Sequence, residues 1–141
     1  MRYRLVAVGR MKDAALRAAC DGYLDRLQHY ARVEEREVKD EARILDAVAE
    51  DSRLVALSRG GEPWTSAELA EWTARWERDA RDVTFAIGGA NTLPDAVLGK
   101  AERIWSLSRM TFPHEVARVL VCEQLYRAHT IRRGEPYHRG P

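Results

Sequence analysis

The most apolar stretch of the chain runs from Ile104 to Arg133, and its pattern predicts a short strand, a loop and a long helix. The strand covers Ile104–Leu107, the loop covers Leu107–Pro113, and the helix follows Pro113 with few interruptions in its apolar character. A helix that is apolar on most sides has to be covered by neighbouring elements. We therefore expect this helix to be central to the fold, and the loop before it to lie at a ligand-binding edge.

Short apolar runs alternate with segments of helical spacing along the rest of the chain. The predicted strands, of which the second is charged and suited to a sheet edge, are Tyr3–Val8, Val33–Val38, Arg53–Leu57 and Asp82–Ile87. Four helices are predicted before the last one. The first follows Asp13 as its N-cap, and the second covers Ala42–Ala49. The third starts at Thr65 or Ser66, where Glu68 completes a capping box, and the fourth covers Pro94–Arg103. Strands and helices that alternate in this way predict an α/β fold, with a largely parallel sheet flanked by helices.

Length and composition indicate one globular domain over residues 1–141. With 45% apolar and 32% charged residues, the chain is unlike disordered or collagen-like proteins. The net charge of +1 gives no general basicity, so binding to a nucleic acid requires a local patch or a partner's help. The N-terminal apolar run is too short for a signal peptide, and no stretch approaches the about 20 apolar residues of a membrane span. We expect a soluble, cytoplasmic protein.

Two cysteines, Cys20 and Cys122, lie among apolar residues of predicted helices. The sequence is compatible with a disulfide or with two buried free thiols, and a reducing cytosol favours the free thiols. No spacing of Cys and His residues indicates a metal site, so we expect no metal.

Three predicted loops follow the carboxyl ends of strands, namely Ser58–Pro63, Gly88-Gly89 and Leu107–Pro113. In an open α/β sheet such loops can form a ligand crevice together. The glycine pair allows a ligand to approach the backbone, although a tight turn is the simpler interpretation. The chain has neither a GxGxxG fingerprint nor a P-loop. A pocket of backbone and apolar side chains suits adenosine and a sulfonium better than a nucleotide phosphate.

Titratable residues gather in the last helix and in the tail after it. Glu123 and Arg127 are four residues apart, as in an ion pair on one helix face, and His114 suits a capping or exposed position. The tail, residues 134–141, is not periodic, and it carries Tyr137, His138 and Arg139. This combination indicates function, but chain ends also collect idle sequence, and the residues alone do not decide.

Several motifs, in the same order along the chain, resemble the bacterial and plastid family of large-subunit ribosomal RNA pseudouridine methyltransferases. They are LVAVG at Leu5–Gly9, LSRGGEPWTS at Leu57–Ser66, RDVTFAIGG at Arg81–Gly89, WSLSRMTFPH at Trp105–His114, RVLVCEQLYRA at Arg118–Ala128 and PYHR at Pro136–Arg139. Members of this family are small SPOUT methyltransferases, whose C-terminal half forms a trefoil knot around the cofactor site. The resemblance therefore implies a single-domain, knotted α/β fold.

The resemblance also implies an S-adenosylmethionine-dependent enzyme that methylates N3 of a pseudouridine in 23S ribosomal RNA, on the assembled ribosome. It places the cofactor against Leu57, Gly88, Gly89, Leu107, Ser108, Arg109, Met110, Thr111 and Phe112. It further implies a homodimer in which the last helix packs on its partner, and this contact would explain the apolar excess of that helix. The tail is expected to form part of the active site, in its own subunit or in the partner's.

Methyl transfer from a sulfonium is an in-line displacement, so the protein mainly positions two reactants and excludes water. The pseudouridine nitrogen must lose a proton, which requires a base or a cation that stabilises the anion. We assign His138 as the candidate base, and Tyr137 and Arg139 as residues that position the nucleotide. Arg118 and Arg127 are assigned to binding RNA phosphate or to fixing the tail.

Two departures from the family pattern fall on the rim of the predicted pocket. The family commonly continues the glycine pair with Pro-Glu-Gly, whereas this chain has Ala90-Asn91-Thr92, and Ser58 stands where an acid is common. These changes allow two alternatives, a SPOUT enzyme with another RNA target and a dimeric ribosome-binding factor that has lost catalysis. Binding of S-adenosylmethionine separates the enzymes from the binding factor.

Overall fold

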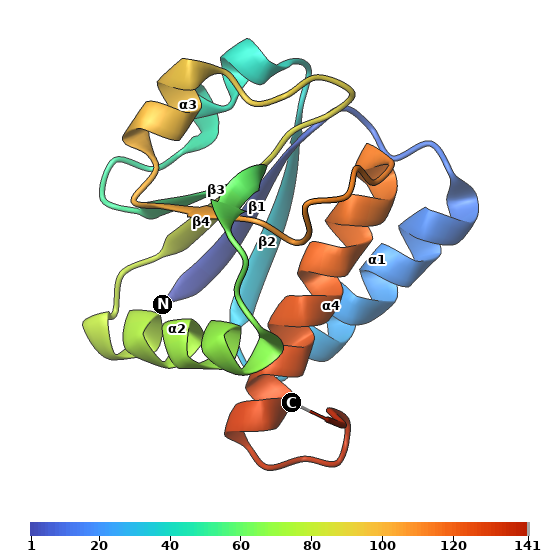
Figure 1. Cartoon of the computed structure of the whole chain (residues 1–141), viewed down its shortest axis with the longest axis vertical. Coiled ribbons are helices and arrows are strands. Elements are labelled where there is room, and N and C mark those ends of the chain that lie inside the picture. Colours follow the sequence, from blue (N-terminus) through green and yellow to red (C-terminus); the bar gives the residue numbers. More distant parts are fainter. Residues whose placement is uncertain (141) are drawn as a thin grey trace.

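Five parallel strands form one sheet in the computed structural model, which describes residues 1–140 (Figure 1). In chain order the strands are β1 (Arg2–Val8), β2 (Arg32–Val38), β3 (Arg53–Glu62), β4 (Val83–Ile87) and β5 (Arg103–Trp105). Their order across the sheet is β2-β1-β4-β3-β5, and each neighbouring pair is parallel. The helices are α1 (Ala14–Leu27), α2 (Ser66–Asp79), α3 (Asp95–Lys100) and α4 (His114–Arg132). The predicted α/β fold with a parallel sheet is confirmed.

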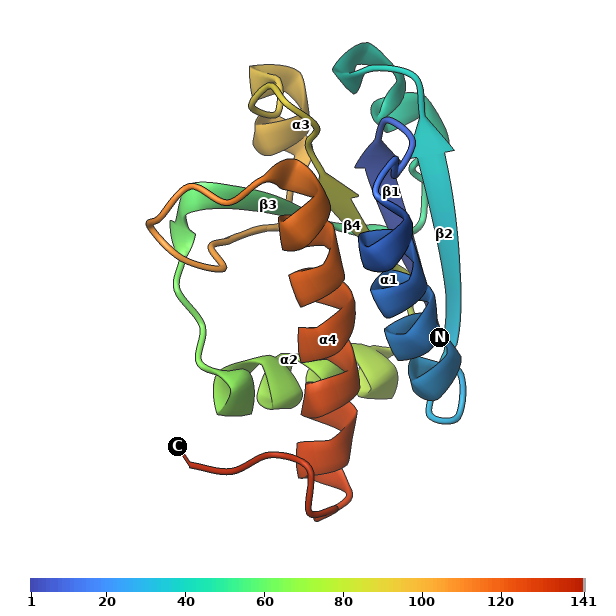
Figure 2. The same cartoon turned by 90° about the vertical axis from the view of Figure 1, so that its right-hand side faces the viewer.

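Helical elements cover both faces of the sheet. The helices α1, α2 and α4 lie on one face, whereas α3 and two short 3₁₀ turns lie on the other (Figures 1 and 2). Side chains alternate accordingly along β1: Tyr3 and Leu5 pack with the first group, and Val6 and Val8 pack with the second. The strand β4 is buried at every position, as expected for a parallel strand covered on both faces.

Local sequence signals set several element ends as predicted. Asp13 caps α1, because its carboxylate accepts from the backbone N–H groups of Ala15 and Leu16. Thr65 and Glu68 form the reciprocal capping box that begins α2. The charged strand β2 lies at an edge of the sheet, also as predicted.

The helix predicted over Ala42–Ala49 is instead a pair of 3₁₀ turns, η1 (Glu41–Arg43) and η2 (Leu45–Ala47). The apolar face survives, because Ile44 and Ala47 are buried in the core on this side of the sheet. So short a segment gains little from helix propagation, so packing against the sheet decides its backbone.

The loop predicted at Ser58–Pro63 is mostly strand, because β3 continues to Glu62. The extension pairs with β5 through an irregularity in which Leu57 and Glu62 both face Trp105. Sequence periodicity does not predict this pairing, since it depends on a partner that lies more than 40 residues later.

Both α3 and β5 are shorter than predicted. The helix ends at Lys100, because the backbone N–H of Glu102 already donates to the carbonyl oxygen of Leu54 in β3 at 2.8 Å. The strand that follows covers Arg103–Trp105 rather than Ile104–Leu107.

The two cysteines lie where α1 packs on α4. Both Cys20 and Cys122 are buried, and their sulfur atoms are 3.4 Å apart without a covalent bond. The structure therefore holds two free thiols rather than a disulfide, as predicted.

The end of β3 passes very close to β5 at Gly61. A Cβ at this position would lie 2.5 Å from the carbonyl oxygen of Ile104, which is too close for any non-bonded contact. Glycine therefore allows the chain around β5 to pack against β3, and this packing shapes the loop that begins at Leu107. The trefoil knot expected for the C-terminal half stays a prediction.

Replacing Gly61 with alanine should destabilise the fold, because the added methyl group overlaps the backbone carbonyl group and the side chain of Ile104. We expect the free energy of unfolding, measured by urea denaturation, to fall by about 2–3 kcal/mol. The matched control is Gly60→Ala, since a Cβ at Gly60 meets no atom within 4 Å. Equal stability of the two variants would contradict this account of the passage.

Candidate functional site

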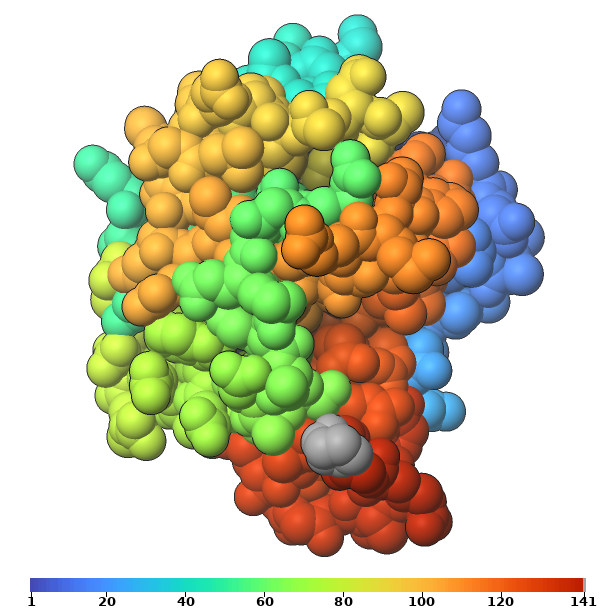
Figure 3. Space-filling model, viewed as in Figure 1, coloured from blue at the N-terminus to red at the C-terminus, as the bar shows by residue number. Residues whose placement is uncertain are grey.

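A pocket lies where three neighbouring strands, β4, β3 and β5, reach the carboxyl edge of the sheet. Its wall comes mostly from the segments 57–60, 87–93 and 107–112, and the first turn of α4 adds His114 and Ala117. The cavity measures about 370 Å³. Figure 3 shows the end of β3 (green) against the segment after β5 (orange) on this face. Open parallel sheets bind ligands at this edge.

The residues predicted to contact a cofactor come together in this pocket. All of them line it except Arg109, which is exposed between two lining residues. The lining members are Leu57, Gly88, Gly89, Leu107, Ser108, Met110, Thr111 and Phe112. Ser58 and the segment 90–92, where the chain departs from the family pattern, also line the pocket.

Six further residues line the pocket without having been assigned to it, namely Arg59, Gly60, Ile87, Leu93, His114 and Ala117. Arg59 falls in the unexpected extension of β3, and His114 and Ala117 lie on one face of the first turn of α4. The sequence did carry a signal for His114 and Ala117, because they stand three residues apart at the start of a helix that directly follows a pocket loop. Arg59 belongs to the segment Ser58–Pro63, which the sequence places at the predicted ligand crevice, although no role was assigned to this residue.

The glycine pair after β4 has a packing role. A Cβ at Gly89 would lie 3.1 Å from the side chain of Val8, and one at Gly88 would lie 3.0 Å from the carbonyl oxygen of Asn91. The pair therefore allows the loop to fold against β1 and back on itself, which supports the tight-turn interpretation. The turn formed in this way lines the pocket. Glycine at positions 88 and 89 therefore suits both the packing of the loop and the approach of a ligand to the backbone.

Hydrogen bonds hold the loop after β5 in a defined shape. The buried Ser106 hydroxyl lies 3.0 Å from the carbonyl oxygen of Arg59 and 3.1 Å from that of Ser108. The backbone N–H of Met110 donates to the Ser108 hydroxyl at 3.0 Å. The Met110 side chain is 71% exposed, so a large apolar group is available to a ligand at the pocket mouth.

The chemistry of the pocket fits an adenosine joined to a positively charged sulfur. Apolar walls come from Leu57, Ile87, Leu107 and Phe112, and neutral oxygens come from Ser58, Asn91 and Thr92. No acidic residue is among the described residues that line it. Within residues 1–140, no cluster of three His, Cys, Asp or Glu side chains could hold a metal ion. No helix in the same range is long and apolar enough to cross a membrane.

The C-terminal tail folds back onto α4 of its own chain. Tyr137 donates its hydroxyl to the carboxylate of Glu123 at 2.7 Å, and its ring centroid lies 4.7 Å from the guanidinium of Arg127. Arg127 also pairs with Glu123 at 2.8 Å and lies 3.1 Å from Nδ1 of His138. Burial and the hydrogen bond to Glu123 raise the pKa of Tyr137, so the phenol stays protonated at neutral pH. The predicted ion pair of Glu123 and Arg127 is confirmed, and Arg127 contacts the tail.

The tail follows the C-terminal end of α4, whereas the segment 107–112, which lines the pocket, precedes its first turn (Figure 2). Ala117 in the pocket and Arg127 beside His138 are ten residues apart on the helix, which corresponds to about 15 Å. Nε2 of His138 is buried without a hydrogen-bond partner in the described chain, and Arg139 is exposed. Within one subunit, the structure does not bring the candidate base to the candidate cofactor site.

Arg118 is buried in an ion-pair network instead of lying free beside the tail. Its side chain is 3% exposed, and it donates to Glu35 at 3.0 Å, to Glu37 and to the carbonyl oxygen of Gly9 at 3.1 Å. Burial is the largest single influence on Glu37 and acts to raise its pKa. The hydrogen bonds from Arg118 and from the backbone N–H of Met11, together with the positive charges of Arg118 and Arg17, outweigh burial, so the pKa is lowered. These surroundings argue against the assignment of Arg118 to RNA phosphate, because its donors already face protein acceptors.

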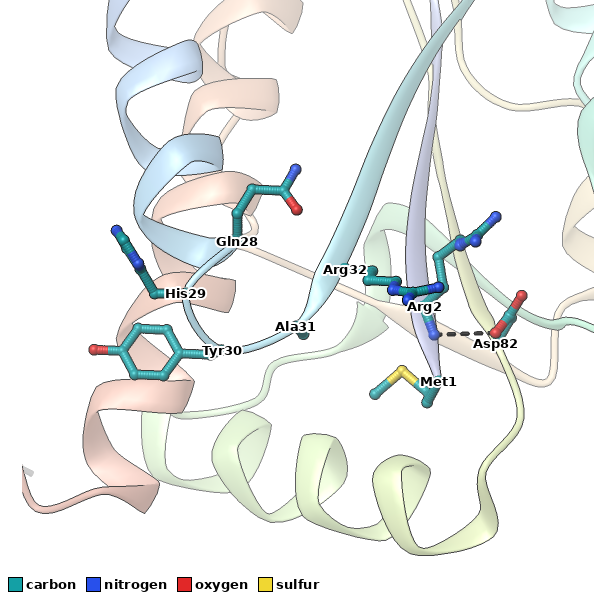
Figure 4. Close-up of a pocket in the computed structure, with 8 residues that line it drawn as sticks. All are labelled: Met1, Arg2, Gln28, His29, Tyr30, Ala31, Arg32 and Asp82. Carbon is teal, nitrogen blue, oxygen red and sulfur yellow. Dashed lines mark hydrogen bonds between the residues drawn. The ribbon is translucent and has the colours of Figure 1, made fainter.

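A more open hollow of about 550 Å³ lies at the opposite, amino edge of the sheet (Figure 4). The backbone N–H of Arg2 donates to the carboxylate of Asp82 at 3.0 Å, and the guanidinium of Arg2 pairs with Glu34 at 3.1 Å. Arg32, His29 and Tyr30 also line it. None of the predicted site residues lies in this hollow.

Comparison with known proteins agrees with the fold and the pocket. Residues 1–138 match the family described as "Predicted SPOUT methyltransferase". Similar proteins are named "Ribosomal RNA large subunit methyltransferase H". The one from Gloeobacter violaceus is 43% identical over 154 aligned positions, which cover 99% of this chain and 100% of that protein. The one from Sorangium cellulosum is 43% identical over 143 positions, which cover 97% and 99%.

Solved structures with the same fold are more distant in sequence. A probable methylase family protein from Haemophilus influenzae gives a TM-score of 0.61 at 11% identity, covering 98% of this chain and 70% of that one. A probable methyltransferase from Bordetella pertussis gives 0.59 at 14% identity, covering 89% and 93%. At such identities these structures support the fold alone. Because the family match extends over residues 1–138 and the sequence relatives are covered almost completely, the chain belongs to the SPOUT methyltransferase family.

Proposed function

We propose that this protein is an S-adenosylmethionine-dependent methyltransferase that modifies N3 of a pseudouridine in 23S ribosomal RNA, on the assembled ribosome. The observation that carries the proposal is the pocket at the carboxyl edge, where eight of the predicted cofactor residues line one cavity. Family membership supports a methyl donor of this type. Relatives matched over their full length carry a name that specifies RNA of the large ribosomal subunit, which supports the substrate class.

When bound, S-adenosylmethionine supplies a methyl group on a positively charged sulfur, which suits in-line displacement. The glycine turn and the apolar side chains of Leu57 and Leu107 would hold the adenosine and exclude water, so the main contribution of the protein is position. N3 of the pseudouridine gains the methyl group and loses its proton. A base is therefore needed in the same site.

We assign this base to His138 of a second copy of the chain, in a homodimer. Within one chain His138 lies beside Arg127, about 15 Å along α4 from the pocket, whereas a base must lie about 3 Å from the proton it removes. Val116 and Leu120 are only half-buried on α4. A second copy packed along this helix would cover them and bring its own tail towards the pocket, where Tyr137 and Arg139 would orient the nucleotide.

The assembled ribosome as substrate is consistent with the small net charge of +1. Affinity for such a target does not require general basicity, because shape and ribosomal proteins can contribute to it. We place the enzyme in the cytoplasm, where ribosomes are found.

The residues that depart from the family pattern support two alternatives, because Ser58 and the segment 90–92 line the pocket itself. A changed rim suits an enzyme of the same kind with another RNA target, or a ribosome-binding factor without catalysis. Mapping of methylated nucleotides in a strain that lacks the gene tests the target directly. Loss of a single N3 methyl group from 23S ribosomal RNA is the expected result, and an intact 23S pattern would contradict the proposal.

Leu107→Ala should weaken the binding of S-adenosylmethionine, because the pocket loses part of its apolar wall. We expect a tenfold increase in Kd by calorimetry, which corresponds to about 1.4 kcal/mol. Leu98→Ala is the matched control, since Leu98 is a partly buried leucine of α3 outside the pocket. If the unaltered protein binds no S-adenosylmethionine, even with ribosomes present, the binding-factor alternative replaces the proposal.

His138→Ala should slow methyl transfer in single-turnover experiments by about 100-fold or more, as expected for the loss of a general base. The affinity for S-adenosylmethionine should not change, because His138 lies outside the pocket. His29→Ala provides the control, since His29 is an exposed histidine at the amino edge of the sheet. An unchanged rate for His138→Ala would remove this residue as the base.

Mixing two inactive variants tests which subunit supplies the tail. Chains with His138→Ala keep an intact pocket, and chains with Leu107→Trp keep an intact tail. If the tail acts in the partner, mixed dimers contain one complete site, and the mixture regains activity. If the tail acts in its own subunit, the mixture stays inactive.

A further inference from the structure

The loop between β1 and α1 carries two cations without a counter-ion, Arg10 and Lys12. Both side chains are exposed, and neither forms an ion pair within residues 1–140. Many arginines elsewhere are neutralised by carboxylates, as Arg2 is by Glu34 and Arg53 by Glu102. With a net charge of +1, an RNA-binding surface has to come from cations that remain unpaired.

The backbone of this loop is held firmly on the side of β2. The N–H of Gly9 donates to the carbonyl oxygen of Val38 at 2.8 Å, and the carbonyl oxygen of Gly9 accepts from Arg118 at 3.1 Å. Gly9 has a φ of +83°, a conformation that favours glycine. Met11 is buried, and its N–H donates to the carboxylate of Glu37 at 3.0 Å. The two cations are therefore presented from a fixed backbone.

The loop is held equally firmly on the side of α4. The backbone N–H groups of Lys12 and Asp13 donate to one oxygen of Glu115, at 3.1 and 3.0 Å. The carboxylate of Asp13 accepts from the first turn of α1. The neighbouring carboxylates thus accept hydrogen bonds from backbone N–H groups. In the described part of the chain, none of them forms an ion pair with the side chain of Arg10 or Lys12.

The loop lies directly beside the cofactor pocket. Val8, at the end of β1, is the residue against which Gly89 packs, and Glu115 follows the pocket residue His114. Figure 3 shows the loop and the start of α1 (blue) bordering the start of α4 (orange). On the other side of β4, the strand β3 carries the exposed pocket residue Arg59. Cations therefore stand on both sides of the glycine turn.

We propose that Arg10 and Lys12 bind phosphates of the substrate RNA and so seat its backbone at the mouth of the cofactor pocket. The proposal rests on the RNA methyltransferase function and names a binding surface for its substrate. Exposed Arg and Lys side chains neutralise phosphates without reading the sequence, and such contacts set the register of the strand. A loop that is already ordered loses little conformational freedom on binding.

The double variant Arg10→Gln, Lys12→Gln tests the proposal. The probe is a fluorescent single-stranded RNA of about 20 nucleotides, titrated with the full-length protein at several salt concentrations. Two lost phosphate contacts should reduce the slope of log K against log salt by about 1.4, which makes binding about 25-fold weaker near 0.1 M salt. The affinity for S-adenosylmethionine and the melting temperature should stay unchanged, because both side chains are exposed and lie outside the pocket lining.

The matched control is Arg32→Gln, Lys100→Gln, which removes the same charge from two exposed residues at the amino edge of the sheet. Arg32 lies in the open hollow of Figure 4. The control should bind RNA like the unaltered protein. Equal RNA binding by the two double variants would overturn the proposal, and a larger loss in the control would place the RNA backbone at the amino edge instead.

Methyl transfer to ribosomes separates this proposal from the function on which it rests. If the unaltered protein methylates ribosomes and the Arg10, Lys12 variant does so at the same KM, only the phosphate-binding surface is wrong. If RNA binding falls as expected but the unaltered protein neither binds S-adenosylmethionine nor transfers a methyl group, the surface stands and the catalytic function is wrong.

Discussion

The buried guanidinium of Arg118 is the contact on which the rest of this structure depends. It joins α4 to the edge strand β2 through Glu35 and Glu37, and to the loop after β1 through the carbonyl oxygen of Gly9. Removing Arg118 or one of its carboxylate partners should destabilise the fold, because charges that are largely buried would lose their counter-ions. The network holds the start of α4 beside the pocket and holds the loop with Arg10 and Lys12 beside the same pocket.

The helix α4 contacts the pocket with its first turn and the C-terminal tail with its later turns. Its first turn lines the candidate cofactor pocket, whereas Glu123 and Arg127 contact the tail farther along the same helix. Within one subunit the pocket and the proposed base, His138, therefore lie apart. A homodimer resolves this separation if the pocket of one copy receives the tail of the other, and the half-buried apolar side chains of α4 offer a surface for that contact.

The charges around the pocket suit a negatively charged substrate. No acidic side chain is among the described lining residues, whereas Arg59 lies at the rim and Arg10 and Lys12 lie on the adjoining loop. Ser58 and the segment 90–92 give this rim uncharged side chains, which do not repel RNA phosphates. These uncharged residues thus lie where the proposed cofactor and RNA would meet.

Local sequence patterns determined the alternation of strands and helices along the chain, the caps at Asp13 and Thr65, and the pocket loops at Gly88-Gly89 and after Leu107. Each of these depends on residues within a few positions, such as a capping side chain or an apolar run. The motifs also assigned eight residues that line one cavity. Only the tertiary structure decided the extension of β3, the burial of Arg118 and the position of the tail. These features depend on partners far away in the chain, such as Trp105 for Glu62 and Glu37 for Arg118, and no spacing along the sequence encodes which distant groups meet.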